Sequence, residues 1–234
     1  MHAEIISVPA RFAGPPGYAN GGWIAGMIAQ ALDFNPAQIT LRSPVPLETD
    51  LILTADRLMV GETLIAEIAP GDFTRDVPPF VSVTEAIAAE SRSHVRSTAE
   101  YGHCLVCGVD RTDGYQLRPG PVSGSTTLVA CRWSPRLISP PLPDTARIPA
   151  IWAAMDCPGV WTVDAALEPM LLGRMTGELT GDFESGTQIG ADDFVVVGEF
   201  YAREGRKMLT STAVYRTDGT LVARAEQVWI SLTV

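Results

Sequence analysis

The chain has 234 residues, of which 46% are hydrophobic and 19% charged, so it can form a packed core and is not a disordered chain. The formal net charge of −10 excludes a general nucleic-acid binder, which needs a positive surface. The longest helix-like apolar stretch, residues 23–32, is too short to span a bilayer and contains Gln30. The N-terminus shows no signal peptide, and the four cysteines do not form a disulfide framework. We therefore expect a cytoplasmic protein with reduced thiols and no membrane partner.

The first half of the chain predicts a strand, a buried helix and four more strands. Residues 4–12 form the first strand in outline, and a turn-rich stretch follows. An apolar helix then begins after Asn20, which can cap its first turn, and it ends near residue 32. This helix is apolar nearly all round, as expected of a helix that other structure surrounds. β-Branched residues and turns then predict strands at residues 39–45, 51–59, 63–69 and 80–88.

The second half repeats this order of elements after a polar, turn-rich connector at residues 90–121. It predicts a strand at residues 126–133, a proline-rich loop, and a second apolar helix at residues 148–157 with Pro149 in its first turn. Four strands follow, at residues 170–179, 193–202, 207–216 and 221–232, the last three joined by natural hairpin turns. An apolar helix followed by antiparallel strands can bury itself against one face of a sheet. The pattern alone leaves a generic pair of α+β domains open as the alternative.

Several segments resemble hotdog-fold thioesterases. The run Phe12-x-Gly-Pro-Pro-Gly-Tyr-x-Asn-Gly-Gly-Trp-x-x-Gly resembles the entry to the central helix of that superfamily, and residues 152–159 resemble the same helix carrying an acid. Residues 172–176 and 221–232 resemble two of its strands, and residues 104–108 are similar to a cysteine-rich segment that precedes some hotdog domains. The resemblance implies an α+β double hotdog: two antiparallel sheets, each wrapped around a central helix, fused in one chain. It implies an N-terminal hotdog at residues 1–100 and a C-terminal hotdog at residues 101–234, with residues 101–124 as connector.

The start of the first helix is a candidate oxyanion site. The superfamily implies a site between two hotdog units, where one helix offers backbone amides to a thioester carbonyl and the other offers a carboxylate. Free amides at a helix N-terminus stabilise a developing negative charge, and glycine lets a substrate approach the backbone. We therefore assign Gly22 and Asn20 as catalytic donors and Gly21, Trp23 and Trp152 as substrate-binding residues. The plainer interpretation is a capped helix start with glycines chosen for packing.

Asp156 is the candidate catalytic acid. It lies in an apolar helix, where burial of a carboxylate is costly and raises its pKa, so it could activate water or attack the carbonyl itself. The alternative is an aspartate that ends the helix before Pro158. Because the first helix has no acid and the second has no Gly-Gly start, the chain can build one active junction. The resemblance also implies that Thr176 helps to hold the attacking water, although threonine is an ordinary strand former.

The cysteines and histidines suggest no further site. Cys104 and Cys107 form a C-x-x-C pair beside His103, which supplies at most half of a tetrahedral zinc site, and the spacing of Cys131 and Cys157 does not repeat it. We therefore interpret the pair as a turn and predict no metal site. No catalytic triad, P-loop or dinucleotide signature is present. Hotdog hydratases depend on a catalytic histidine, and neither predicted helix contains one.

The predicted function is hydrolysis of an acyl-CoA-type thioester, a small-molecule substrate. Coenzyme A is part of that substrate, no cofactor is predicted, and Arg42, Arg92 and Arg96 are candidates for its phosphates. The main alternative is a non-catalytic protein that binds acyl groups or small hydrophobic ligands, and a weaker one is a purely structural subunit. By analogy with other hotdog proteins we expect a homodimer.

Overall fold

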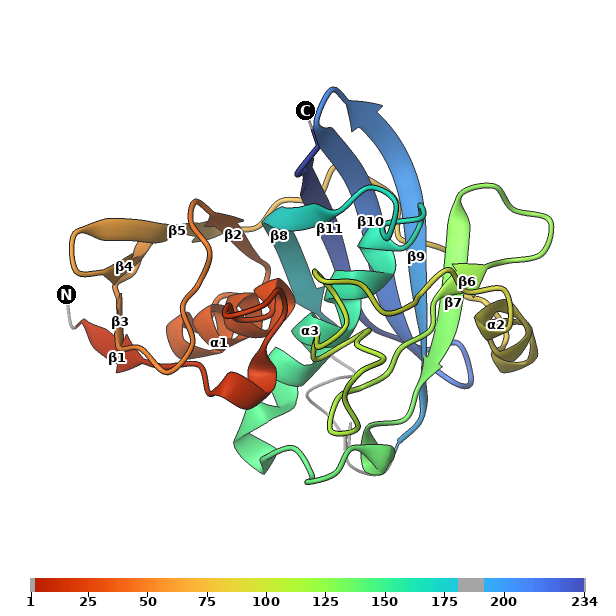
Figure 1. Cartoon of the computed structure of the whole chain (residues 1–234), viewed down its shortest axis with the longest axis horizontal. Coiled ribbons are helices and arrows are strands. Elements are labelled where there is room, and N and C mark those ends of the chain that lie inside the picture. The colour runs from red at the N-terminus through yellow and green to blue at the C-terminus, as the bar shows by residue number, and fades with distance from the viewer. Residues whose placement is uncertain (1–2, 181–191, 234) are drawn as a thin grey trace.

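The computed structural model describes residues 3–180 and 192–233. In this part of the chain the strands form one antiparallel sheet, in the order β1-β3-β4-β5-β2-β8-β11-β10-β9-β7-β6 (Figure 1). The strands are β1 (Glu4–Ile6), β2 (Ala37–Leu41), β3 (Leu51–Leu53), β4 (Arg57–Val60), β5 (Thr63–Pro70), β6 (Gly120–Pro121), β7 (Leu128–Trp133), β8 (Met170–Leu179), β9 (Phe194–Glu204), β10 (Lys207–Arg216) and β11 (Leu221–Ser231).

The helices are α1 (Gly21–Leu32), α2 (Val83–Glu90) and α3 (Arg147–Val160), with short 3₁₀ turns at Ala10–Phe12, Pro135–Leu137 and Asp144–Ala146. Asn20 caps α1 as predicted, because its side chain accepts a hydrogen bond from the Trp23 amide. In Figure 1, α1 and α3 cross on one side of the sheet, and α2 lies apart from them beside β7. None of the helices in the described residues is long and apolar enough to cross a bilayer.

The prediction of two antiparallel sheets is not confirmed, because the described strands form one continuous sheet. The strands of the first half and those of the second meet where β2 pairs with β8, with Gln38 opposite Thr176. This pairing satisfies backbone groups that two separate half-sheets would leave exposed at their edges. The predicted domain boundary at residue 100 stays a prediction.

The segment at residues 80–88, predicted as a strand, forms helix α2 instead. Ser82 caps it by accepting a hydrogen bond from the Glu85 amide at 3.2 Å, and three alanines favour the helix. Ala86 and Ala89 pack on a cluster that includes Val195, in the second half of the sheet. The predicted strand at residues 51–59 is likewise divided into β3 and β4 by a turn closed from Thr54 to Arg57.

Helices α1 and α3 approach each other closely because glycines face the contact. A Cβ atom at Gly22 would lie 2.5 Å from the carbonyl oxygen of Trp152 and 2.7 Å from the Cβ of Asp156. A Cβ atom at Gly26 would lie 2.6 Å from the Cα of Pro149. The first turn of α1 is therefore held directly against the middle of α3.

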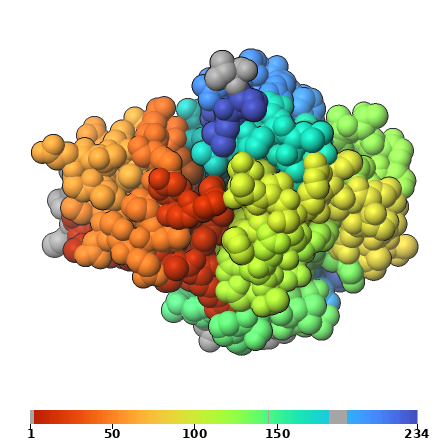
Figure 2. All heavy atoms as spheres, in the orientation of Figure 1, coloured from red at the N-terminus to blue at the C-terminus, as the bar shows by residue number. Residues whose placement is uncertain are grey.

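The connector, although polar and turn-rich in sequence, packs over the helices. The Leu105 amide donates to the Ala13 carbonyl at 2.7 Å, and the Tyr101 hydroxyl bonds the backbone of Met170. Leu105 is fully buried. In Figure 1 this segment runs in front of α3, and in Figure 2 it lies against the red N-terminal residues. The connector thus closes one side of the region between α1 and α3.

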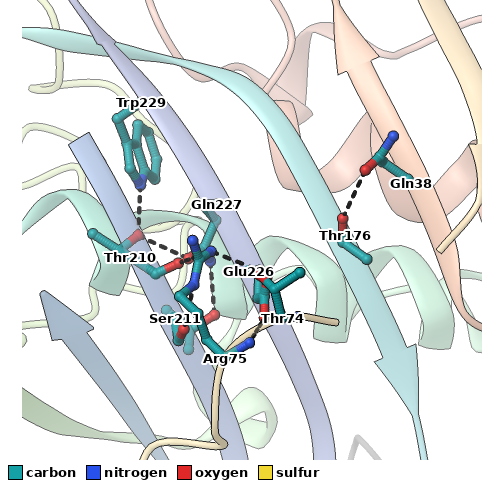
Figure 3. A network of polar contacts seen from close by, with 10 residues as sticks. Gln38, Thr74, Arg75, Thr176, Thr210, Ser211, Glu226, Gln227 and Trp229 are labelled. Carbon is teal, nitrogen blue, oxygen red and sulfur yellow. Dashed lines mark hydrogen bonds and ion pairs between the residues drawn. The ribbon is translucent and has the colours of Figure 1, made fainter. Parts of the chain in front are cut away.

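Loop 71–76 crosses the sheet face opposite the helices and is anchored by a buried ion pair. Glu226 accepts hydrogen bonds from the Thr74 amide at 2.8 Å and from the Arg75 amide, and it pairs with the Arg75 guanidinium at 3.5 Å (Figure 3). The Arg75 guanidinium also donates to the Ser211 hydroxyl and the Thr210 carbonyl. This loop links the first half of the chain to β10 and β11.

Candidate active site

Asp156 is buried in the middle of α3. Asp156 is 3% exposed, and the helix continues beyond it through Pro158 to Val160. The predicted burial is therefore confirmed, and the alternative that Asp156 ends the helix is wrong. Pro158 is accommodated within the last turn.

Two donors from the start of α1 hold one oxygen of this carboxyl group. Oδ2 of Asp156 accepts a hydrogen bond from Asn20 Nδ2 at 2.8 Å and from the Gly22 amide at 2.9 Å. Oδ1 is also buried, but it has no hydrogen-bond partner within the described residues. The structure thus brings three of the predicted catalytic residues into direct contact and leaves one carboxyl oxygen available.

Burial raises the pKa of Asp156 to about 7, because the ionised form loses its hydration. The hydrogen bonds from Gly22 and Asn20 act in the opposite direction, since they stabilise the carboxylate. Asp156 is therefore able to exchange a proton near neutral pH.

Asn20 links helix capping to the acid. Its side-chain oxygen accepts from the Trp23 amide at 2.9 Å, which leaves its NH₂ group to face Asp156. The same nitrogen lies 3.9 Å from Sγ of Cys104. The side chain is thereby fixed in one orientation by partners on both sides.

The amide of Gly22, predicted to stabilise an oxyanion, already donates to Asp156. Gly22 is also not among the residues that line the adjacent cavity, whereas Gly21 is. The described residues offer the Gly21 amide no hydrogen-bond acceptor. Gly21, a predicted substrate-binding residue, therefore lines the cavity and has an amide that donates no hydrogen bond within the described residues.

A cavity of about 440 Å³ opens beside Asp156, Asn20 and Gly21. Its walls are mainly apolar and come from the loop before α1, from the segment that follows β2, from β8 and from β11; they include Tyr18, Val45, Leu172 and Ile230. Arg42 also lines it; its side chain is half exposed and pairs with Glu67. The cavity therefore combines apolar walls with a few polar groups at one end, which is typical of a ligand site.

The remaining predicted site residues lie elsewhere. Trp152 is buried against Gly177 of β8, and Trp23 stacks on Phe12 with ring centroids 3.7 Å apart; neither lines the cavity. Thr176 does not line it either, because its side chain points to the opposite face of the sheet, where its hydroxyl lies 3.4 Å from Gln38 Oε1 (Figure 3). These three side chains do not join Asp156.

Among the three arginines considered for phosphate binding, only Arg42 lines this cavity. Arg92 pairs with Glu85 of α2, and Arg96 pairs with Asp164. Neither Glu85 nor Asp164 lines the cavity, so both ion pairs lie outside its wall.

The second junction between α1 and α3 has its own cavity of about 340 Å³, near the start of α3. The part of α1 that lines it contributes Trp23, Met27, Gln30 and Ala31, without a carboxylate. Pro149, which has no amide hydrogen, lines the α3 side. Glu4 of β1 also lines this second cavity, so the assignment of a single active junction stays a prediction.

Three cysteines meet next to Asp156. The sulfur atoms of Cys104, Cys107 and Cys157 lie within 4.8 Å of one another, and His103 is exposed and not part of the group. Cys104 accepts hydrogen bonds from the thiols of Cys107 and Cys157, and these bonds lower the pKa of the Cys104 thiol below its ordinary value. The sequence did not predict this cluster because Cys157 lies far from the C-x-x-C pair along the chain.

Comparison with known proteins supports the fold. No family model matches the sequence, and none of the curated proteins matches it significantly. A conserved hotdog-fold protein of unknown function from Alicyclobacillus acidocaldarius superposes with a TM-score of 0.64 at 13% identity, over 99% of this chain and 94% of that chain. A presumed thioesterase from Novosphingobium aromaticivorans gives a TM-score of 0.66 at 13% identity, over 97% and 94% of the two chains.

An acyl-CoA thioesterase II, TesB2, from Mycobacterium marinum gives a TM-score of 0.57 at 10% identity, over 92% of this chain and 89% of that chain. Dehydratase domains are also among the matches. The neighbours cover nearly the whole chain, so the protein has the hotdog fold. Its structural neighbours include thioesterases, at identities too low to transfer an activity.

Proposed function

We propose that the protein hydrolyses an acyl-CoA-type thioester in the cavity beside Asp156. The proposal rests on the burial and hydrogen bonding of the two oxygens of the Asp156 carboxyl group. One oxygen is fixed by two donors from α1, and the other is buried without a partner in the described residues at the wall of an apolar cavity. A buried carboxyl oxygen without a hydrogen bond is costly, and a bound water would satisfy it.

In this reaction Asp156 acts as the general base. A water molecule hydrogen-bonded to Oδ1 gives a proton to the carboxylate as its oxygen attacks the thioester carbonyl carbon. The Gly21 amide, at the positive end of the α1 dipole, stabilises the oxyanion. Collapse of the tetrahedral intermediate breaks the C–S bond, and the proton passes from Asp156 to the departing thiolate. The products are a carboxylic acid and the free thiol of coenzyme A.

The apolar walls of the cavity suit an acyl chain rather than a polar substrate. Val45, Leu172 and Ile230 line it. Arg42 also lines it, and its guanidinium can bind a phosphate group of coenzyme A. Hydration chemistry is less well supported, since neither α1 nor α3 contains a histidine.

The test is release of free thiol from a panel of acyl-CoA substrates of different chain length. We expect the wild-type chain to hydrolyse at least one of these substrates. Asp156→Asn should lower kcat by at least about 100-fold, which is the lower limit of the rate enhancement that a general base typically contributes. Thr176→Val is the matched control, because that side chain lies on the other face of the sheet, and it should hydrolyse at the wild-type rate. Equal activity of Asp156→Asn and wild type would refute the mechanism.

A second candidate function is binding of an acyl group without hydrolysis. It is favoured by the Gly22 amide, which donates to Asp156 instead of facing the cavity. A rise in Tm with an acyl-CoA or a free fatty acid, together with no thiol release across the panel, would support this candidate.

A further inference from the structure

Three cysteine thiols converge at the wall of the cavity, and the proposed hydrolysis uses none of them. Cys104 and Cys107 come from the connector, whereas Cys157 follows Asp156 in α3. Sγ of Cys104 lies 3.5 Å from Sγ of Cys157, and all three sulfur atoms lie within 4.8 Å of one another. The three residues are at most 5% exposed. Segments distant in the sequence are therefore folded around one small volume that sulfur atoms surround.

The separation of these sulfur atoms suits a soft metal ion. With Zn–S distances of about 2.3 Å, a tetrahedral site places its sulfur ligands about 3.8 Å apart. The separations in the cluster, 3.5 Å for one pair and no more than 4.8 Å for the others, need little adjustment to reach this value. Thiolate ligands select zinc and monovalent copper over magnesium or calcium.

The backbone around the C-x-x-C pair is arranged as a tight turn that presents both sulfurs on the same side. The Gly108 amide donates to the Cys104 carbonyl at 2.9 Å, and a Cβ atom at Gly108 would lie 2.4 Å from that oxygen. The Val106 amide points at Sγ of Cys104 at 3.4 Å. A backbone donor to sulfur stabilises a thiolate and orients it, as outer-shell groups do around bound metals.

A disulfide explains the cluster less completely. It would join two of the sulfurs at about 2.05 Å and leave the third buried beside them without a purpose. Convergence of three thiols, two of them from a turn that orients their side chains, is instead what a metal site requires.

We propose that Cys104, Cys107 and Cys157 bind one Zn²⁺ ion through their thiolates. Cys104 and Cys157 line the cavity, so a water molecule or another exchangeable ligand can complete the tetrahedron from that side. The ion ties the connector to α3 at the residue next to Asp156 and so stabilises the wall of the cavity. The site does not depend on the proposed hydrolysis.

The test uses the full chain, reduced and freed of metal under nitrogen, and titrated with Zn²⁺ against a chromogenic chelator. We expect one equivalent of Zn²⁺ to bind. Replacement of a ligand in Cys104→Ser, Cys107→Ser or Cys157→Ser should weaken binding by more than about 100-fold, beyond the loss expected for an outer-shell group. Cys131→Ser is the matched control, because Cys131 is buried but lies outside the cluster, and it should bind as the wild type does.

Titration of the wild type with Co²⁺ gives a second readout, which remains valid even if the serine variants fail to fold. A bound cobalt ion should show thiolate-to-metal charge-transfer absorption of the strength expected for three thiolates, and excess Zn²⁺ should remove it. The proposal is overturned if the reduced protein takes up no metal saturably, or if the three serine variants bind as tightly as Cys131→Ser. It is also overturned if a Cys104–Cys157 disulfide forms in the metal-free protein and added Zn²⁺ does not slow its formation. Because the readout is metal binding, absence of thioesterase activity leaves this result unchanged.

Discussion

Asn20 Nδ2 donates a hydrogen bond to Oδ2 of Asp156 at 2.8 Å, which joins the residue before α1 to the middle of α3. The same side chain caps α1 through the Trp23 amide. Asn20 thus performs two tasks, one for helix stability and one for the orientation of the acid. Its replacement should affect both.

Asn20→Ala should lower the free energy of unfolding by about 0.5–2 kcal/mol, the range for loss of a helix cap, and should also reduce hydrolysis, because Asp156 loses a donor. The measurements are urea unfolding and thiol release. Ser82→Ala is the matched control, since Ser82 caps α2 and has no contact with Asp156. It should show a similar loss of stability with activity retained. Equal activities of the two variants would argue against a positioning role for Asn20.

Gly22→Ala should destabilise the protein by about 1–3 kcal/mol, because its Cβ would meet the Trp152 carbonyl at 2.5 Å and displace Asp156. Hydrolysis should fall with it. Gly26→Ala crowds the same pair of helices, at 2.6 Å from Pro149, but away from the acid. We expect comparable destabilisation by thermal unfolding and much better retention of activity in Gly26→Ala; the reverse order would contradict the assigned site.

The buried Asp156 should make stability depend on pH. Its folded pKa of about 7 lies above the unfolded value of about 3.9, so the folded state holds a proton that the unfolded state loses. The resulting contribution to stability is fully present below about pH 4 and is lost as the pH rises towards 7, by up to roughly 4 kcal/mol. Asp156→Asn has no group to titrate there.

Urea unfolding of metal-free wild type and Asp156→Asn between pH 4 and pH 8 measures this effect. The variant should gain stability relative to the wild type as the pH rises. A difference between the two proteins that stays constant with pH would show that Asp156 titrates normally.

The ion pair between Arg75 and Glu226 should stabilise the attachment of loop 71–76. Their side chains are 8% and 10% exposed, so Glu226→Ala leaves a buried charge without its partner and should cost about 3–5 kcal/mol. Arg136→Ala, which removes an exposed pair with Asp193, should cost less than about 1 kcal/mol. Chemical unfolding measures the loss in free energy of unfolding for each variant. Similar losses would mean that solvent screens the ion pair between Arg75 and Glu226.

The hydrophobic pattern was sufficient to predict most elements of the fold. It predicted α1 with its Asn20 cap, α3, and the bounds of β8 and β10 as observed. It failed at α2, where alanines and a serine cap give a helix in a segment whose β-branched residues and turn punctuation suggested a strand. The predicted homodimer stays a prediction.

The sequence by itself determined that α1 and α3 are buried helices, because periodicity and local capping are properties of neighbouring residues. It also marked Asp156 as a carboxyl group in an apolar helix, which burial in the structure confirms. Tertiary structure decided which groups meet Asp156, since Gly22, Cys104 and the cavity walls come from segments far apart in the chain. Side-chain contacts across such distances depend on how α1, α3 and the connector pack in three dimensions, and no local pattern encodes that arrangement.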